Sequence, residues 1–294
     1  MDALGDLLRG VRADGALFGR WTVTAPWSLR FADGAPLTLC TLVRGTGWLV
    51  PAEGEPLLLR RGDTALVRGP APFTFVDALT AAPEDASGPS AELVSGAYRS
   101  ESDIGRRLTG ALPPVLIVPD EGEPEGCGVL HEFIAAEVAA DKPGQQFVLD
   151  RLMDWMLVCT LRAWFERPEA CPPAWYRALG DPVVGAALRA MHDAPARPWT
   201  IAALAAGSGV SRASLAKRFT ELVGEPPLAY LTGWRMTLAA ELLAEPEATV
   251  SGVARRVGYA DGFAFSAAFK RERGLSPSAH RATRVGADRE PVGA

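Results

Sequence analysis

The chain has 294 residues, of which 48% are apolar and 22% charged, and it contains 8 Trp and 11 Phe. This length is typical of two domains, and the composition excludes a disordered or fibrous chain. The net charge of −5 argues against a nucleic-acid-binding protein, but the charge is unevenly divided. Residues 1–194 carry 17 Lys and Arg against 26 Asp and Glu, whereas residues 195–285 carry 12 against 7. The basic part is therefore the candidate for binding nucleic acid.

Cysteine spacing and the first residues favour a cytoplasmic protein. The four cysteines form no CxxC pair, so we expect neither a disulfide scaffold nor a zinc ribbon. The opening segment MDALGDLLRGVRADG mixes acidic residues with apolar ones and lacks the continuous apolar core of a signal peptide. Apolar runs stay shorter than the roughly 18–20 residues of a membrane span, so we expect no contact with a membrane.

The first part of the chain is predicted to be rich in strands. Residues 2–13 have leucines at helical spacing and predict a short amphipathic helix. From about residue 15 to residue 118, β-rich runs alternate with Gly, Pro and Asp turns every 8–12 residues or so, which is typical of an antiparallel sandwich or barrel. The predicted strands are 17–23, 27–31, 37–43, 47–50, 56–59, 64–67, 73–76, 91–98 and 115–118. Residues 81–90 and 120–128 are polar loops.

Two helices, 129–140 and 145–166, are predicted after the strands. The second has an apolar stripe that is wide for a surface helix and includes Trp155 and Met156. The stripe fits packing on the strand domain or a dimer interface between two chains, and we favour the dimer. Residues 167–180 are rich in proline and are predicted to link a domain at 1–166 to a helical domain at 181–285, with a flexible tail at 286–294.

The helical domain has local signals for each break. Helices are predicted at 181–193, 200–206, 211–222, 226–244, 249–256, 262–273 and 276–283. Ser211 and Ser276 are suitable N-caps, and Pro182 and the Pro226-Pro227 pair fit first-turn positions. Four glycines are expected to end helices: Gly207, Gly224, Gly258 and Gly274.

One pattern occurs twice in this region, at residues 199–223 and 249–274. Each copy has a short helix with an alanine, a turn with a glycine, and a second helix with a phenylalanine beside a basic pair. This is the arrangement of a helix-turn-helix unit, whose second helix enters the major groove of DNA. The helix between the copies has about 19 residues and spans about 28 Å. That length is comparable to the ~34 Å between successive major-groove faces, so both second helices could enter adjacent turns of one groove.

These segments resemble a known family. PWTIAALAAGSGVSRASLAKRF, VGEPPLAYLTGWRMTLAAELL and VARRVGYADGFAFSAAFKRERGLSPSAHR resemble the DNA-binding domain of AraC-type transcription regulators. GWLV, RRGDTALV, LPPVLIV and LDRLMDWMLVCTLRAW resemble the cupin-like sensor domain of one branch of that family. The resemblance implies an α+β fold with two domains: an N-terminal antiparallel β-barrel with appended helices, and an all-α domain with two helix-turn-helix units. It also implies that the protein binds double-stranded DNA and activates transcription by contacting RNA polymerase, with repression as the alternative. The wide apolar stripe of the helix at 145–166 is what favours a homodimer.

The resemblance assigns DNA contacts in both copies. In the first copy it implies major-groove contacts from Ser211, Arg212, Ala213, Ser214 and Lys217. Arg212 is expected to read a base, because an Arg can bind guanine through both O6 and N7. Arg218 and Arg235 are expected to bind phosphates or internal carboxylates. Arg218 is included among the predicted DNA-binding residues.

The second copy departs from the family pattern. Its contacts are expected from Asp261, Gly262, Phe263, Ser266 and Lys270, with Lys270 and Arg271 on phosphates. The family commonly has an arginine directly after the serine, where this chain has Ala267. Because alanine donates no hydrogen bond, we expect this copy to read little sequence and to serve mainly as a backbone anchor.

Metal chemistry is not expected in the strand domain. A metal-dependent cupin needs several inward histidines with a carboxylate. The three histidines, His131, His192 and His280, all lie outside residues 17–118. We therefore expect no metal, no cofactor and no catalytic residue. The alternatives are a cupin-type enzyme with a helical accessory domain, and a DNA-repair protein of the alkyl-transfer type, which would need a cysteine beside a base.

The signal that the first domain senses is left open between a small molecule and oxidation. Cys40 fits a small apolar core residue, or a redox sensor with Cys127 as its partner. Some family members have a Cys-Gly pair where this chain has Ser95-Gly96, which weakens the redox interpretation. A small effector in the barrel is favoured. The aromatic residues available to line its mouth, which also fit a plain core, are Trp21, Trp27, Phe31, Trp48, Phe73 and Phe75.

Overall fold

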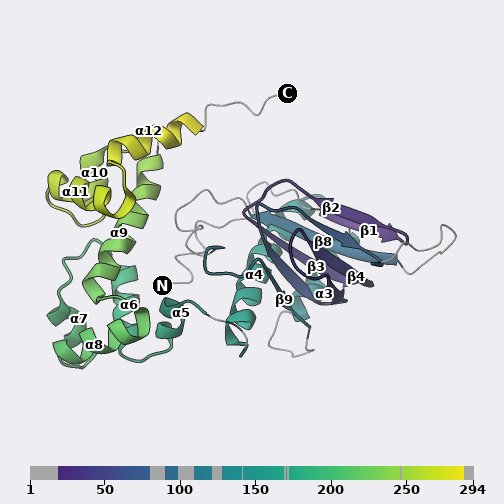
Figure 1. Ribbon diagram of the computed structural model, residues 1–294, viewed down its shortest axis with the longest axis horizontal. Helices are drawn as coiled ribbons and strands as arrows, with labels where there is room; N and C mark the ends of the chain where they lie inside the picture. The colour runs from purple at the N-terminus through teal and green to yellow at the C-terminus, as the bar shows by residue number, and fades with distance from the viewer. Residues whose placement is uncertain are drawn as a thin grey trace. The chain divides into compact units, whose positions relative to one another are not determined.

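A computed structural model describes residues 19–79, 90–98, 109–120, 128–140, 142–168, 170, 172–245 and 247–287. The chain divides into two compact units, and the boundary lies between Ala170 and Pro172. The predicted helix at 2–13, Cys127, Cys171 and residues 288–294 lie outside the described residues, as does most of the two predicted loops. Figure 1 shows a unit of strands with two helices and a unit made of helices.

The first unit contains two antiparallel sheets. The larger has the order β1-β8-β3-β6-β9 and the smaller the order β2-β7-β4-β5. The strands are β1 Gly19–Thr24, β2 Ser28–Phe31, β3 Leu37–Arg44, β4 Thr46–Pro51, β5 Leu57–Arg60, β6 Thr64–Arg68, β7 Phe73–Val76, β8 Ser90–Tyr98 and β9 Val115–Val118. All nine predicted strands are confirmed, each to within two residues at its ends.

Alternation along the strands produces one apolar core between the sheets. In the smaller sheet Phe73 and Phe75 of β7 are buried while their neighbours are only half-buried. Cys40 and Leu42 of β3 contribute to the same core from the larger sheet. The residues of β3 that point the other way, including Thr41, are also buried. The larger sheet is therefore covered on both faces, which requires a second layer.

Two helices form that second layer: α3 Gly128–Ala140 and α4 Gln145–Glu166. The hydroxyl of Tyr98 in β8 donates to the carbonyl of Met153 in α4 at 2.7 Å. At Gly96, a Cβ atom would lie 3.1 Å from the Met153 methyl, so glycine permits the close approach of α4. The apolar stripe of α4 is thus divided, because Met153 and Met156 are fully buried whereas Trp155 is 53% exposed. One face packs on the sheet, and an apolar face remains on the surface.

The second unit contains eight described helices. They are α5 Ala174–Leu179, α6 Val184–Asp193, α7 Ile201–Gly207, α8 Arg212–Val223, α9 Pro227–Ala244, α10 Val250–Arg256, α11 Gly262–Arg273 and α12 Pro277–Ala287. All seven predicted helices are present. The first begins three residues later than predicted, after a turn in which the carboxylate of Asp181 accepts hydrogen bonds from the amides of Val183 and Val184.

Helix α5 lies within the segment predicted to be a linker. Its Trp175 and Ala178 are buried in the core that also contains Leu188 and Phe219. The helical unit therefore begins at Pro172 and not at residue 181. The proline-rich composition suggested an irregular segment, but burial of one tryptophan provides enough apolar contact to fix a short helix there.

Helix α9 is shared by two separate cores. Leu231 and Trp234, in its first half, belong to the core around Phe219. Met236 and Leu243, further along, belong to the core around Phe269. Each copy of the repeated pattern thus packs on its own stretch of one continuous helix.

Candidate DNA interface

The first copy of the pattern is a helix-turn-helix formed by α7 and α8. Thr200 caps α7 by accepting from the amide of Ala203 at 3.1 Å, and Ser211 caps α8 by accepting from the amide of Ser214 at 3.1 Å. The turn between them is made by Gly209, whose φ of 69° is in the left-handed region. Gly207, which was predicted to end α7, is the last residue of that helix.

Helix α8 buries one face and exposes the face predicted to read DNA. Leu215 and Phe219 are fully buried. The predicted contact residues are all exposed, namely Ser211, Arg212, Ala213, Ser214, Lys217 and Arg218. Leu215 and Phe219 are one turn apart and fix the rotation of α8 about its axis, so the positions between them must face outward. The surface offers hydroxyl and cationic donors at the start of the helix.

The second copy is formed by α10 and α11 with the same local chemistry. Thr249 caps α10, and Gly258, with a φ of 87°, makes the turn. Asp261 caps α11, accepting from the amides of Phe263 and Ala264. Asp261 was expected to face DNA, but its carboxylate is occupied by this cap. Of the other predicted contacts, Phe263, Lys270 and Arg271 are exposed, while Gly262 and Ser266 are partly buried.

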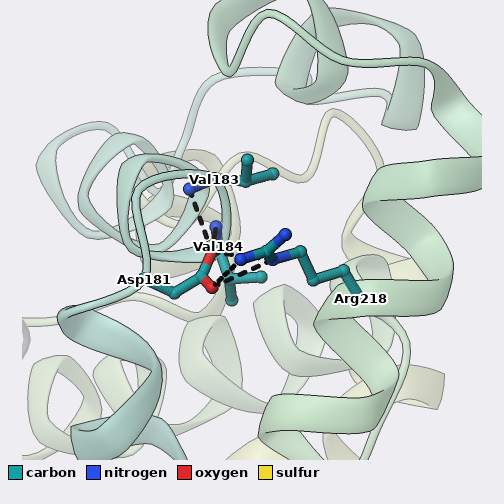
Figure 2. Close-up of polar contacts among 4 residues, drawn as sticks. All are labelled: Asp181, Val183, Val184 and Arg218. Carbon is teal, nitrogen blue, oxygen red and sulfur yellow. Dashed lines mark hydrogen bonds and ion pairs between the residues drawn. The ribbon is translucent and has the colours of Figure 1, made fainter.

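Arg218 is held by a carboxylate of its own unit. Its Nε donates to both oxygens of Asp181 and its Nη2 donates to Oδ2, with the shortest distance 2.6 Å (Figure 2). Partial burial acts to raise the pKa of Asp181, but the hydrogen bonds from Arg218, Val183 and Val184 outweigh it and lower that pKa below its ordinary value. Of the two partners that the sequence left open, the internal carboxylate is the one observed. The pair joins α8 to the start of α6.

Arg235, on α9, joins the two copies. Its Nε donates to the carbonyl of Pro195 and its Nη2 to the carbonyl of Arg197, both at 2.7 Å. Its guanidinium also lies over the ring of Tyr259, 5.9 Å from the centroid. At Gly258 a Cβ atom would lie only 2.4 Å from the carbonyl oxygen of Ala196. The loop before α7 and the turn of the second copy are thus packed together, and Arg235 binds carbonyls where a phosphate or carboxylate was expected.

The remaining basic side chains differ in whether they form an ion pair with a carboxylate of the protein. Arg256 pairs with Glu245 at 2.6 Å, whereas Lys217 is 3.9 Å from Glu221 and thus weakly held. Within the described ranges, Arg212, Arg255 and Lys270 make no ion pair. Arg255 is exposed at the end of α10 and was not among the predicted contacts. The two adjacent arginines at the end of α10 could have identified Arg255 as a candidate DNA contact.

The comparisons with known proteins agree with this geometry. A family described as a cupin matches residues 2–166, and one described as a helix-turn-helix domain matches residues 204–283. A protein of Streptomyces antibioticus named as an AraC-like transcription regulator is 33% identical over 96% of this chain and 98% of its own. A protein of Streptomyces lividans with the same name is 34% identical over the same shares. The chain belongs to the AraC family of transcription regulators.

A more distant relative and a solved structure are also named as transcription factors. The transcriptional activator RclR of Escherichia coli, named as RCS-specific, is 27% identical over 96% of this chain and 97% of its own. The crystal structure of the DNA-binding domain of AdpA in complex with a target DNA is 29% identical, covers 38% of this chain and all of that one, and has a TM-score of 0.36. As in other AraC-family regulators, the function of this chain is to bind DNA and regulate transcription, with a cupin-like domain in front of the helix-turn-helix units.

The cysteine that was considered as a redox sensor is buried in the regulator's cupin-like unit. Cys40 has no exposed surface, and burial, reinforced by the charge of Asp33, raises the pKa of its thiol far above the ordinary value. A sensor cysteine needs access and a thiolate, and Cys40 offers neither. The structure therefore supports the interpretation of Cys40 as a core residue. Its suggested partner, Cys127, lies outside the described residues.

The aromatic residues considered for an effector site pack on one another. Phe31 stacks on Phe73 with 4.8 Å between ring centroids, and Trp21 and Phe75 meet Phe31 edge-on. Trp27 packs in the same core against Gly47. Trp48 pairs with Val76 on the half-buried face of the smaller sheet, and so does not belong to this cluster. These rings form the core between the sheets.

A buried polar chain connects α3 to the larger sheet. His131 is 8% exposed and lies 3.0 Å, through Nε2, from the hydroxyl of Thr64. Thr64 donates to Thr41, which donates to the carbonyl of Asp63. Because the hydroxyl proton of Thr64 is already used, His131 must donate from Nε2. Burial lowers the pKa of His131, against the charges of Asp120 and Asp63, so the neutral ring is favoured.

Among the residues that the structure describes, no group of three or more His, Cys, Asp or Glu is placed to hold a metal ion. Over the same residues, every helix is too short or too polar to cross a membrane.

Proposed function

We propose that the regulator reads its operator through the exposed face of α8, with Arg212 on a guanine and Ser211, Ala213, Ser214 and Lys217 in the same groove. The main support for this proposal is that α8 has a buried face, which contains Leu215 and Phe219, and an exposed face that begins with Arg212. Since no ion pair is described for Arg212, its guanidinium is available to bind O6 and N7 of a guanine.

The second copy engages the next turn of DNA. Helix α9 has 18 residues and so spans about 27 Å. Lys270 and Arg271, near the end of α11, contact phosphates and fix the register of the complex. Arg218 stays on Asp181 and contributes by holding α8 in position.

A mobility-shift titration tests the assignment of Arg212. The probe is duplex DNA from directly upstream of the protein's own gene, measured between about 50 and 200 mM salt, with random duplex as competitor. Arg212→Ala should weaken specific binding by about 1–3 kcal/mol, or roughly 5- to 150-fold, and random DNA much less. Arg30→Ala removes the same charge from an exposed position of β2 and should change neither. Equal losses on both DNAs would refute base reading by Arg212.

The regulator forms a homodimer through the exposed apolar face of α3 and α4. That face includes Phe133, Phe147 and Trp155, which are 55%, 68% and 53% exposed, while the opposite faces of both helices are buried. Large apolar side chains exposed in this way are typical of an interface, and a second copy supplies a matching surface. Light scattering should give twice the chain mass for the wild type and one chain mass for Trp155→Asp. A monomeric wild type, with and without operator DNA, would refute the dimer.

A small molecule bound in the cupin-like unit changes how the dimer presents its two DNA-binding units. The regulator acts in the cytoplasm without a catalytic step, and activates transcription by contacting RNA polymerase. The names of its relatives as transcription regulators support this proposal, and the burial of Cys40 favours a ligand over oxidation. In vitro transcription with purified RNA polymerase and the upstream promoter should yield more transcript when the protein is added. Less transcript would indicate a repressor.

A further inference from the structure

The most exposed large apolar side chain described in the structure belongs to Phe263, which is 89% exposed. It is the second residue of α11, and its amide donates to the Oδ1 of Asp261 at 3.0 Å. The backbone at this position is therefore fixed by the helix cap. A partner that covers this ring removes its apolar area from water, which is favourable.

The N-caps align the two copies residue by residue. Ser211 caps α8 and Asp261 caps α11, so each position of α8 corresponds to the position 50 residues later. The buried positions then match, since Leu215 corresponds to Phe265 and Phe219 to Phe269, and all four are fully buried.

The exposed positions of the same alignment do not match. Arg212 corresponds to Gly262 and Lys217 to Ala267, so the two cationic donors of the first copy are absent from the second. Ala213 corresponds to Phe263, which places an aromatic ring where the first copy has a methyl group. The hydroxyl of Ser266 donates to the carbonyl of Gly262 at 2.8 Å. The first turns of α11 thus present an apolar surface to any partner.

Charges around this surface identify the partner as a polyanion. Residues 249–285 contain seven Lys and Arg and two Asp and Glu. Arg255, Lys270 and Arg271 are exposed near Phe263 in sequence and on the same pair of helices. An apolar centre with cations beside it fits the major groove of DNA, where the C5-methyl group of thymine is the apolar feature of the base edges.

We propose that the second copy reads thymine methyl groups through Phe263, in place of the hydrogen bonds used by the first copy. This inference rests on the proposed DNA-binding function and names what α11 recognises. It replaces the expectation that the second copy is mainly a backbone anchor. The half-site facing α11 is then defined by the position of thymines, with Lys270 and Arg271 on the flanking phosphates.

Deoxyuridine tests this proposal, because it pairs like thymidine and lacks only the C5-methyl group. Duplexes that bind the full-length protein are selected from a random library, and each thymine is then replaced by deoxyuridine in turn. At one or two positions of the half-site facing α11, affinity for the wild type should fall about fourfold, as expected for exposing one methyl group. Phe263→Ala should bind the thymine duplex more weakly and should show no further loss with deoxyuridine at those positions.

The controls separate the possible failures. Leu79→Ala removes another exposed apolar side chain, 49% exposed in the other unit, and should keep the deoxyuridine effect unchanged. If the wild type is indifferent to deoxyuridine throughout that half-site, or if Phe263→Ala keeps the sensitivity, the proposal is overturned. A defect of Phe263→Ala in transcription with normal DNA affinity would also overturn it and indicate a protein partner. Failure to select any sequence would instead refute the proposed DNA reading as a whole.

Discussion

Replacing Phe269 by alanine should destabilise one DNA-binding copy and leave the other unaffected. Phe269 is fully buried, lies 5.7 Å from the ring of Phe265 and meets His280 of α12 edge-on at 5.4 Å. Its core contains residues of the second half of α9 and of α10 and α11, whereas the core around Phe219 uses the first half of α9. Removing the ring should therefore destabilise residues 249–287 selectively.

The size of the effect follows from the burial of the whole side chain. A fully buried Phe replaced by Ala costs about 3–5 kcal/mol, the sum of lost apolar transfer and the cavity left behind. At about 1.4 kcal/mol per tenfold change, the equilibrium for opening the second copy should shift roughly 100- to 4,000-fold toward the open form. The contribution of α11 to DNA binding should fall, and that of α8 should be retained.

Amide hydrogen exchange followed by mass spectrometry of the full-length protein measures both copies in one experiment. In Phe269→Ala, peptides covering 250–273 should lose protection by this factor, and peptides covering 201–223 should exchange at the wild-type rate. Phe219→Ala provides the reciprocal control, and Phe263→Ala, at an exposed position, should change neither set. Equal losses in both sets of peptides for either core variant would refute the idea of separate cores.

Three further predictions concern burial and backbone geometry. The pKa of His131 is lower in the folded protein than in the unfolded chain, so its contribution to stability should be complete above about pH 6.5 and should be lost as the pH falls toward the pKa of the folded state. Thermal unfolding between about pH 5 and 7.5 should show this dependence in the wild type and a flatter one in His131→Gln. In native protein, iodoacetamide should modify the half-buried Cys159 but leave the buried Cys40 intact, as read by mass spectrometry; equal labelling would contradict its burial. Gly258→Ala should lower the free energy of unfolding by roughly 1–3 kcal/mol and with it the melting temperature, since the φ of Gly258 is 87° and an added Cβ would collide with the carbonyl oxygen of Ala196. An unchanged melting temperature would contradict this packing.

The sequence predicted elements and helix faces well because both depend on local patterns. β-rich runs between Gly, Pro and Asp turns located the nine strands, and Ser211 was correctly predicted as the N-cap that starts α8. The role of Trp175 was missed because proline-rich composition hides the burial of a single side chain. That Arg218 would meet Asp181, 37 residues earlier, depends on how α8 packs against the start of α6. Local spacing contains no information about such a pair.

Comparison of the two copies separates the residues that folding requires from those that binding requires. Both copies pack on α9, so both need large apolar side chains at the two buried positions of the second helix, and Leu215, Phe219, Phe265 and Phe269 meet that need. The exposed positions are not constrained by α9, and there the copies differ completely in chemistry. Had both copies only anchored the backbone, a cationic surface would have served each equally well. An exposed Phe263 on one copy and an exposed Arg212 on the other is instead what two different half-sites would require.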